Sequence, residues 1–166
     1  SSGTWSLMGV ELSEPVINDL SMKLNYTNEI GYGGSIRLLK NIIGMWLIQE
    51  CRREWEGQGD ALDYEEMTRL AGEAAPFKSL IHPADPRFIP PGGMPDRIAA
   101  FCRETSQTVP GTKGAMLRCA LESLALLYRK TLQDIEIMTG NRVDVLHIVG
   151  GGSRNRLLNQ WTANAL

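Results

Sequence analysis

The chain has 166 residues, 43% of them hydrophobic and 22% charged, a composition that supports one buried core and leaves no room for a large multidomain enzyme. Its 17 basic and 19 acidic side chains give a formal net charge of -2, so no overall positive field attracts nucleic acid or an anionic membrane. No apolar run approaches the roughly 18 residues that a membrane span needs. The composition therefore predicts a cytoplasmic protein without nucleic-acid or membrane partners.

The three cysteines are too few and too scattered for a disulfide framework or a structural zinc site. Cys102 and Cys119 fall on successive predicted helices and could lie close together. An intracellular setting favours free thiols over a disulfide at this pair.

The first forty residues predict a small antiparallel sheet. Residues 4–10 mix β-branched and aromatic side chains with small ones, as a strand does. A second short strand is predicted at residues 35–39, after the glycine-rich break at residues 30–34. These segments predict an antiparallel hairpin or a three-stranded meander.

Two amphipathic helices are predicted next. From Ile42 the apolar residues take helical spacing, and the glycines within residues 57–59 end that helix. A second helix is predicted over residues 64–74, with Asp60 or Asp63 as its N-cap.

A proline-rich segment separates these helices from the predicted core helix. Residues 82–95 contain five prolines, which predicts a surface loop rather than a core strand. Pro95 suits the first turn of a third helix over residues 96–104. Residues 113–138 carry the longest helical pattern, which predicts a core helix that stops at Gly140.

The last part of the chain predicts a strand, a glycine turn and a helix. Residues 143–149 are a β-branched run of strand length, and His147 within it is expected to be a hydrogen-bonded core histidine. Helical spacing follows over residues 153–166. This order of elements is typical of an α/β fold.

The strongest chemical signal is the motif GGGSRN, which separates that strand from the last helix. Gly150, Gly151 and Gly152 would let a ligand approach the backbone, and the free N–H groups of a following helix suit a phosphate. Asn155 could reach a ribose, base or phosphate oxygen. The motif is neither a Walker A loop nor a complete dinucleotide fingerprint. A nucleotide site and a ligand-free turn both stay open on this motif alone.

A second and weaker signal stands at the start of the chain. Gly3 and Thr4, in a predicted turn, can offer backbone N–H groups and a hydroxyl to a terminal phosphate. A plain turn before a strand is the more frequent explanation of such a pair.

Several segments together resemble the C-terminal half of the FGGY carbohydrate kinases. The segments are SGTWSL at 2–7, YTNE at 26–29, IRLLKN at 36–41, GMWLIQE at 44–50, DPRF at 85–88 and IVGGGSRN at 148–155. Their order and spacing carry the resemblance, which covers nearly the whole chain. It implies an α/β ribonuclease H-like, actin-like ATPase lobe, with residues 1–166 as part of the C-terminal nucleotide-binding lobe of a sugar kinase.

The resemblance also implies cofactors and site residues. In such kinases Mg-ATP lies between two lobes, and an Asp deprotonates the sugar hydroxyl that attacks the γ-phosphoryl group. Carried over by position, Gly3 and Thr4 would lie near the terminal phosphates, and the GGGSRN motif would line the adenosine and α-phosphate site. Asn41 would face the sugar and Gln49 the nucleotide. Because these two residues are eight positions apart, they are expected on one edge of one helix.

The chain departs from the family pattern at its ends. The catalytic Asp of the family belongs to a segment just upstream of the first turn, and the chain begins after it. We therefore expect a lobe truncated at both ends, with no catalytic residue and no metal ligand, and no kinase turnover from these residues alone.

The resemblance leaves more than one function open. The substrate it favours is L-rhamnulose, phosphorylated on its 1-hydroxyl, and kinases of L-fuculose, D-xylulose or L-ribulose are alternatives in the same family. A third hypothesis is an actin-like module that binds ATP without transferring phosphate.

Overall fold

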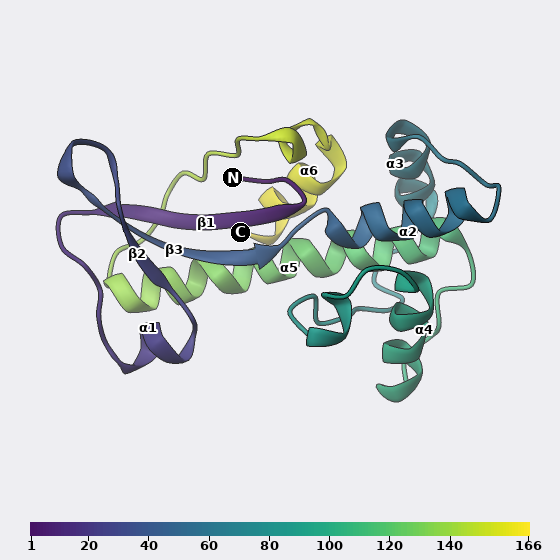
Figure 1. The fold of residues 1–166 in the computed structure, drawn as a ribbon, viewed down its shortest axis with the longest axis horizontal. Coiled ribbons are helices and arrows are strands. Elements are labelled where there is room, and N and C mark those ends of the chain that lie inside the picture. Colours follow the sequence, from purple (N-terminus) through teal and green to yellow (C-terminus); the bar gives the residue numbers. More distant parts are fainter.

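The computed structural model describes residues 1–166, which form one sheet and a set of helices arranged along a single long helix (Figure 1). The strands are β1 (Trp5–Leu12), β2 (Thr27–Ile30) and β3 (Ile36–Ile43). The α-helices are α1 (Asp19–Lys23), α2 (Trp46–Gly57), α3 (Tyr64–Glu73), α4 (Met94–Glu104), α5 (Lys113–Thr139) and α6 (Arg156–Ala165). Three short 3-10 turns complete the order: η1 (Tyr32–Gly34), η2 (Pro86–Phe88) and η3 (Gly151–Arg154).

The sheet is antiparallel, with strand order β1-β3-β2. The two predicted strands pair antiparallel, as β1 and β3. β2 was not predicted; it forms a hairpin with β3, joined by η1. The meander alternative is wrong, because β3 lies between the other two strands and pairs with β1 along its whole length, from Trp5 opposite Ile43 to Leu12 opposite Ile36. This pairing keeps residues 40–43 in the strand, so α2 begins at Trp46 rather than at the predicted Ile42.

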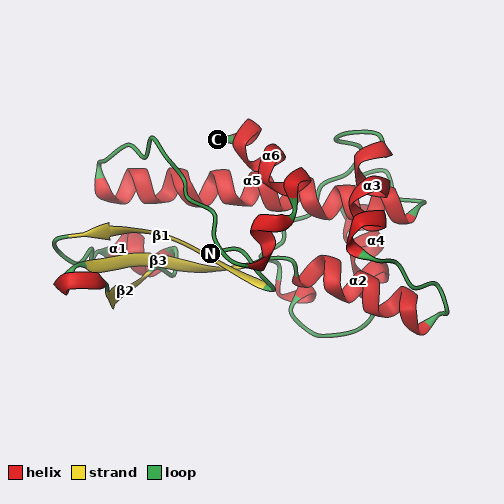
Figure 2. Cartoon of the chain, turned by 90° about the horizontal axis from the view of Figure 1, so that it is seen from above, coloured by secondary structure: helices red, strands yellow, loops and turns green.

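The predicted core helix is confirmed as α5, which runs the length of the molecule (Figure 1). Its C-terminal half covers one face of the sheet (Figure 2), and its other neighbours are α2, α3 and α6. The Thr112 hydroxyl caps its first turn, and Gly140 ends it with a left-handed φ of 67°. Because one helix contacts both the sheet and the helical end, the two halves share a single hydrophobic core.

The other predicted helices are also confirmed. Asp63, not Asp60, is the N-cap of α3, since its carboxylate accepts the N–H of Glu66. Pro95 lies in the first turn of α4 as expected. The short helix α1 was not predicted; Asn18 and Ser21 form a reciprocal capping box that starts it.

The predicted strand at residues 143–149 is wrong. The segment is extended, but it makes no strand pairing. Its one backbone hydrogen bond to the residues that lead into β1 runs from Ser2 N–H to Val149 O, at 2.8 Å. A β-branched run needs a neighbouring strand to become part of a sheet, and none pairs with this one. Val145 and Val149 are accordingly 66% and 60% exposed, and His147 is exposed rather than in the core.

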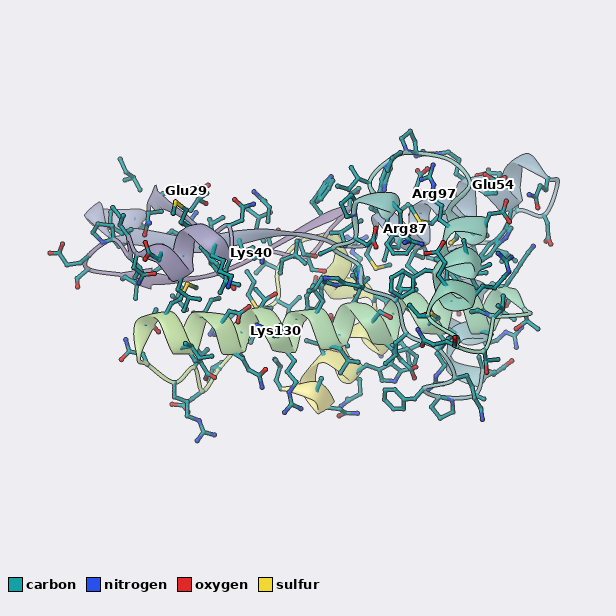
Figure 3. All side chains as sticks on the ribbon, turned by 90° about the horizontal axis from the view of Figure 1, so that it is seen from below. Glu29, Lys40, Glu54, Arg87, Arg97 and Lys130 are labelled. Carbon is teal, nitrogen blue, oxygen red and sulfur yellow. The ribbon has the colours of Figure 1, made fainter.

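The proline-rich segment is a surface loop, as predicted, and it is fastened to α2. The indole N–H of Trp46 donates to the carbonyl oxygen of Phe88 at 3.0 Å, and the Phe88 ring is fully buried. Glu50 accepts the N–H of Gly92 at 2.7 Å, and Glu54 accepts the N–H of Gly93 at 3.1 Å. Figure 3 shows Glu54 at this end of the molecule, together with Arg87 and Arg97. These bonds hold the loop against α2.

All three cysteines are buried and free, as expected. Burial raises the pKa of the Cys119 thiol to about 12, and it raises the pKa of the Cys102 thiol as well. No helix combines the length and the hydropathy that crossing a membrane requires.

Candidate functional site

A cleft of about 920 Å³ opens where the first turn of the chain, α2, α3 and the η3–α6 segment meet. This volume is within the range of sites that hold a small-molecule ligand. Six of the eight residues predicted for the site line it: Gly3, Thr4, Gln49, Gly151, Gly152 and Asn155. The other two, Asn41 and Gly150, do not.

The two predicted phosphate turns come from opposite ends of the chain and are joined directly. Ser2 donates its N–H to Val149 O at 2.8 Å, and Gly152 donates its N–H to Ser2 O at 2.8 Å. A side chain at Gly152 would place Cβ 2.2 Å from the Ser2 hydroxyl oxygen. Gly150 has a φ of 93°, and a Cβ there would lie 2.7 Å from Ser2 O. These two glycines are therefore required by the protein's own packing.

Gly151 is the glycine of the motif that remains open. No atom lies within 4 Å of a Cβ built at this position. The motif therefore leaves open space only at Gly151, whereas Gly150 and Gly152 pack against Ser2.

The first turn is fixed on its other side by the start of α2. Gly3 O accepts the N–H of Met45 at 2.8 Å, and Thr4 O accepts the N–H of Trp46 at 3.0 Å. A Cβ at Gly44 would lie 2.5 Å from Gly3 O, so the close approach needs a glycine there. The carbonyl groups of the turn are thereby used to cap α2.

Several hydrogen-bond donors of the same turns have no acceptor within the protein. The backbone N–H groups of Gly3, Thr4 and Gly151, and the hydroxyl of Thr4, have no acceptor in the chain. The amide of Gln49, half-buried in the cleft wall, also makes no side-chain hydrogen bond. A set of N–H and O–H donors from two turns can hold the oxygens of an anionic group.

Two arginines add positive charge at this edge of the cleft. Arg154 and Arg156 line it, are exposed, and pair with no carboxylate. A phosphate or other anion in the cleft would therefore meet charge that the protein leaves unneutralised.

Asn155 has a structural role beside any ligand contact. Its side-chain oxygen accepts the N–H of Leu158 at 2.9 Å and so caps α6. Only the NH₂ group of Asn155 remains to contact a ligand.

The α3 wall was not foreseen from the sequence. One face of α3 lines the cleft, with the side chains of Tyr64, Glu65, Thr68 and Arg69. Their spacing on the helix could have identified the face, but nothing in the sequence indicated that it lies opposite the glycine turn. Met45, Arg154 and Arg156 also line the cleft without having been predicted to do so.

The α3 wall carries an ion-pair network. Arg69 contacts Glu66 at 2.7 Å and Glu73 at 2.6 Å, and these hydrogen bonds raise the pKa of the Arg69 guanidinium. Because its charge is shared with two carboxylates, Arg69 contributes less net positive charge to the cleft than Arg154 and Arg156 do.

The prediction that Asn41 and Gln49 share one helix is wrong. Asn41 lies in β3, opposite Leu7 of β1, and is exposed, whereas Gln49 lies in the first turns of α2. The strand pairing extends β3 to Ile43, so the chain changes from strand to helix between the two residues.

The cleft offers few ligands for a metal ion. Glu65 is its one carboxylate, and the structure contains no group of three or more His, Cys, Asp or Glu side chains that could hold a metal. The residues present do not fit a resident Mg²⁺ site.

The chain forms a mixed α/β lobe in which two glycine-containing turns face a polar cleft. A xylulose kinase from Bifidobacterium adolescentis matches 95% of this chain and 29% of that chain, with a TM-score of 0.61 and 16% sequence identity. The likeness shows that the two share a fold.

The family follows from the sequence comparison. The model of the C-terminal domain of the FGGY family of carbohydrate kinases matches residues 1–166, and the chain belongs to this family. Similar relatives are rhamnulokinases from Bacteroides thetaiotaomicron (51% identical over 166 residues), Enterococcus faecalis (47% over 166) and Bacillus subtilis (42% over 164). The matches span 99% or more of this chain and 33% of each relative, so the chain spans about one third of the length of these relatives.

Proposed function

We propose that this chain is the nucleotide-binding part of a longer cytoplasmic kinase, which transfers the γ-phosphoryl group of ATP to the 1-hydroxyl of L-rhamnulose. The names of the similar relatives support the substrate, and three free buried cysteines are consistent with a reducing compartment. The observation that carries the proposal is the gathering of unpaired N–H donors from two turns in one cleft.

In this proposal the residues on the two sides of the cleft contact different parts of the nucleotide. Gly3 and Thr4 hold the terminal phosphates, with the Thr4 hydroxyl as a further donor. Gly151 and the NH₂ group of Asn155 contact the adenosine and α-phosphate region, and Gln49 contacts the nucleotide from α2. Gly150 and Gly152 act indirectly, because they allow Ser2 to support the glycine turn.

The reaction needs groups beyond these residues. The sugar oxygen attacks the γ-phosphorus, the bond from this phosphorus to the β-phosphate oxygen breaks, and the sugar proton passes to a general base. We place that base, an Asp, outside residues 1–166. Mg²⁺ enters as part of the Mg-ATP substrate, bound to phosphate oxygens and water, and neutralises charge on the phosphates.

Asn41 remains our candidate for the sugar side. It lies outside the nucleotide cleft, which is consistent with a contact to the second substrate. Asn41→Ala should then raise the KM for the sugar and leave the KM for ATP unchanged; the reverse pattern would remove Asn41 from the sugar site.

The test is an ADP-release assay on the full-length protein, that is, this chain together with the part that the relatives have in addition. L-rhamnulose, L-fuculose, D-xylulose, L-ribulose and glycerol are compared as acceptors. A preference for L-rhamnulose supports the proposal. A preference for another sugar keeps the kinase and changes the substrate, and ATP binding without turnover on any sugar supports the non-catalytic module.

The isolated chain provides a second test. Residues 1–166 should release no ADP in the presence of ATP and ketose, because the general base and the opposing lobe are proposed to lie elsewhere. Ketose-dependent ADP formation by the isolated chain would contradict this placement of the base.

A further inference from the structure

Arg118 lies on α5 behind the cleft, and its side chain joins two other helices. Its Nη1 donates to the carbonyl oxygens of Ala71 (3.3 Å), Gly72 (3.1 Å) and Ala74 (2.7 Å), at the C-terminal end of α3. Its guanidinium carbon lies 4.5 Å from the ring centroid of Trp161 in α6. One planar group therefore caps α3 and stacks on α6 at the same time.

The orientation of this guanidinium is fixed from α5 itself. Its Nε donates to Glu122 Oε1 at 2.7 Å, and Glu122 Oε2 accepts the N–H of Phe77 at 2.9 Å, just beyond α3. The side chains of Arg118 and Glu122 are 13% and 4% exposed, so water competes weakly for these bonds. The Arg118–Glu122 pair therefore connects α3, α5 and α6 in a fixed geometry.

The two helices that Arg118 joins carry two of the walls of the cleft. α3 carries Tyr64 and Thr68 on one wall, and the N-terminal turn of α6 carries Asn155 and Arg156 on the other. Both helices pack on α5 (Figure 1). Between themselves they approach closely at Gly72, where a Cβ would lie 4.0 Å from Leu157 Cδ2, an ordinary van der Waals separation.

We propose that Arg118 is a positioning residue that sets the spacing between the α3 wall and the glycine-turn wall of the nucleotide cleft. The role rests on the function proposed above, since it assumes that the cleft holds ATP. Arg118 touches no ligand itself. It acts through the last turn of α3 and through Trp161, so its loss lets the two walls separate or rotate on α5.

The first experiment compares Arg118→Met and Arg118→Lys with a matched control in the full-length protein. The control is Arg129→Met: Arg129 is also on α5 and donates to Ala165 O of α6 at 3.0 Å, but at the end of α6 away from the cleft. Lysine keeps the positive charge, but it lacks the planar guanidinium that contacts three carbonyl oxygens, a carboxylate and an aromatic ring at the same time. Both Arg118 variants should therefore be impaired.

The expected result is a split between kinetic constants. Both Arg118 variants should raise the KM for ATP by roughly tenfold, as for a small misplacement of binding groups, while the KM for the sugar stays unchanged. Arg129→Met should leave both constants unchanged. A role in stability alone predicts the opposite: a lower melting temperature and a smaller active fraction, with both KM values as in the parent protein. That pattern would overturn the proposal.

A second experiment does not depend on kinase activity. Hydrogen exchange of the unliganded protein should become faster at residues 150–155 and in α3 together when Arg118 is replaced, and not when Arg129 is replaced. If the parent protein neither binds ATP nor releases ADP, the proposed function fails, and this measurement still decides the role of Arg118. Faster exchange confined to α3, with residues 150–155 unchanged, would show that Arg118 does not couple the two walls.

Discussion

Gly152 donates its backbone N–H to the carbonyl oxygen of Ser2 at 2.8 Å, and this bond joins turns that lie 150 positions apart in the chain. The space for it exists because residue 152 has no side chain: a Cβ would lie 2.2 Å from Ser2 Oγ and 3.0 Å from the Ser2 carbonyl carbon. The candidate phosphate site therefore depends on a contact between two backbones.

Gly152→Ala should destabilise the protein by about 1–3 kcal/mol, because the methyl group overlaps Ser2 and the turn has to move. Gly151→Ala is the matched control: its Cβ meets nothing within 4 Å, so its melting temperature should stay at the parent value. Thermal unfolding of the two variants measures the difference. Equal melting temperatures would show that the two turns are not packed as described.

Asn155 can be separated into its two roles by a pair of substitutions. Asn155→Ala removes the N-cap of α6 and should cost about 1 kcal/mol of stability. Asn155→Ser keeps a capping oxygen and loses the NH₂ group, so stability should be near the parent value. If the NH₂ group contacts the nucleotide, both variants raise the KM for ATP. A normal KM in the serine variant would limit Asn155 to its structural role.

Substitutions at Thr162 and Tyr128 measure how much the buried hydroxyl groups near the first turn contribute to stability. The hydroxyl of Thr162 is buried without a hydrogen-bond partner, so Thr162→Val should leave stability unchanged or raise it. The Tyr128 hydroxyl is bonded to Ser6 Oγ at 2.8 Å, and Tyr128→Phe should cost about 1 kcal/mol. Chemical denaturation of both variants gives the two values. A clear loss of stability in Thr162→Val would mean that its hydroxyl has a partner, such as an ordered water.

Lys40 predicts a dependence of stability on pH. Burial lowers the pKa of its ammonium group below 10.5, against a smaller opposite effect of Asp134 on α5. Lys40 and Lys130 lie on the facing sheet and helix (Figure 3). At pH values below the lowered pKa, Lys40 is charged in both the folded and the unfolded protein, so folding bears the full free-energy cost of burying the charge. As the pH rises toward 10.5, Lys40 loses its proton first in the folded protein, and this destabilisation disappears.

Lys40→Met should accordingly raise the melting temperature at pH 7, with a gain that shrinks as the pH approaches 10.5. Lys130→Met is the contrasting variant: it removes the ion pair of Lys130 with the buried carboxylate of Asp134 and should lower the melting temperature. A gain for Lys40→Met that is constant from pH 7 to pH 10 would exclude the titration of Lys40 as its cause.

Local sequence patterns were enough for most of the helices and for most of the candidate site. The helical spacing within residues 113–138, the Asp63 cap and the first-turn proline of α4 act over one or two turns, so the chain itself determines them. The motifs around Gly3 and Gly151 also indicated two turns able to hold phosphate, and the structure brings both to one cleft.

What the sequence could not supply is which segments become neighbours. Residues 143–149 have the composition of a strand and yet pair with none, while Asn41 remains in β3 because Trp5 pairs with Ile43. A strand is completed by hydrogen bonds to another segment, so its own residues do not determine it.

The cleft also depends on which distant segments become neighbours, and only the tertiary structure decides this. The sequence by itself determined the helices, the two glycine-containing turns and the donors they present. Packing on α5 decided that the Tyr64 face of α3 lies opposite Arg156, and that Arg118 supports both walls. Helix periodicity states which residues share a face, whereas the partner of that face is chosen by burial against segments distant in the chain.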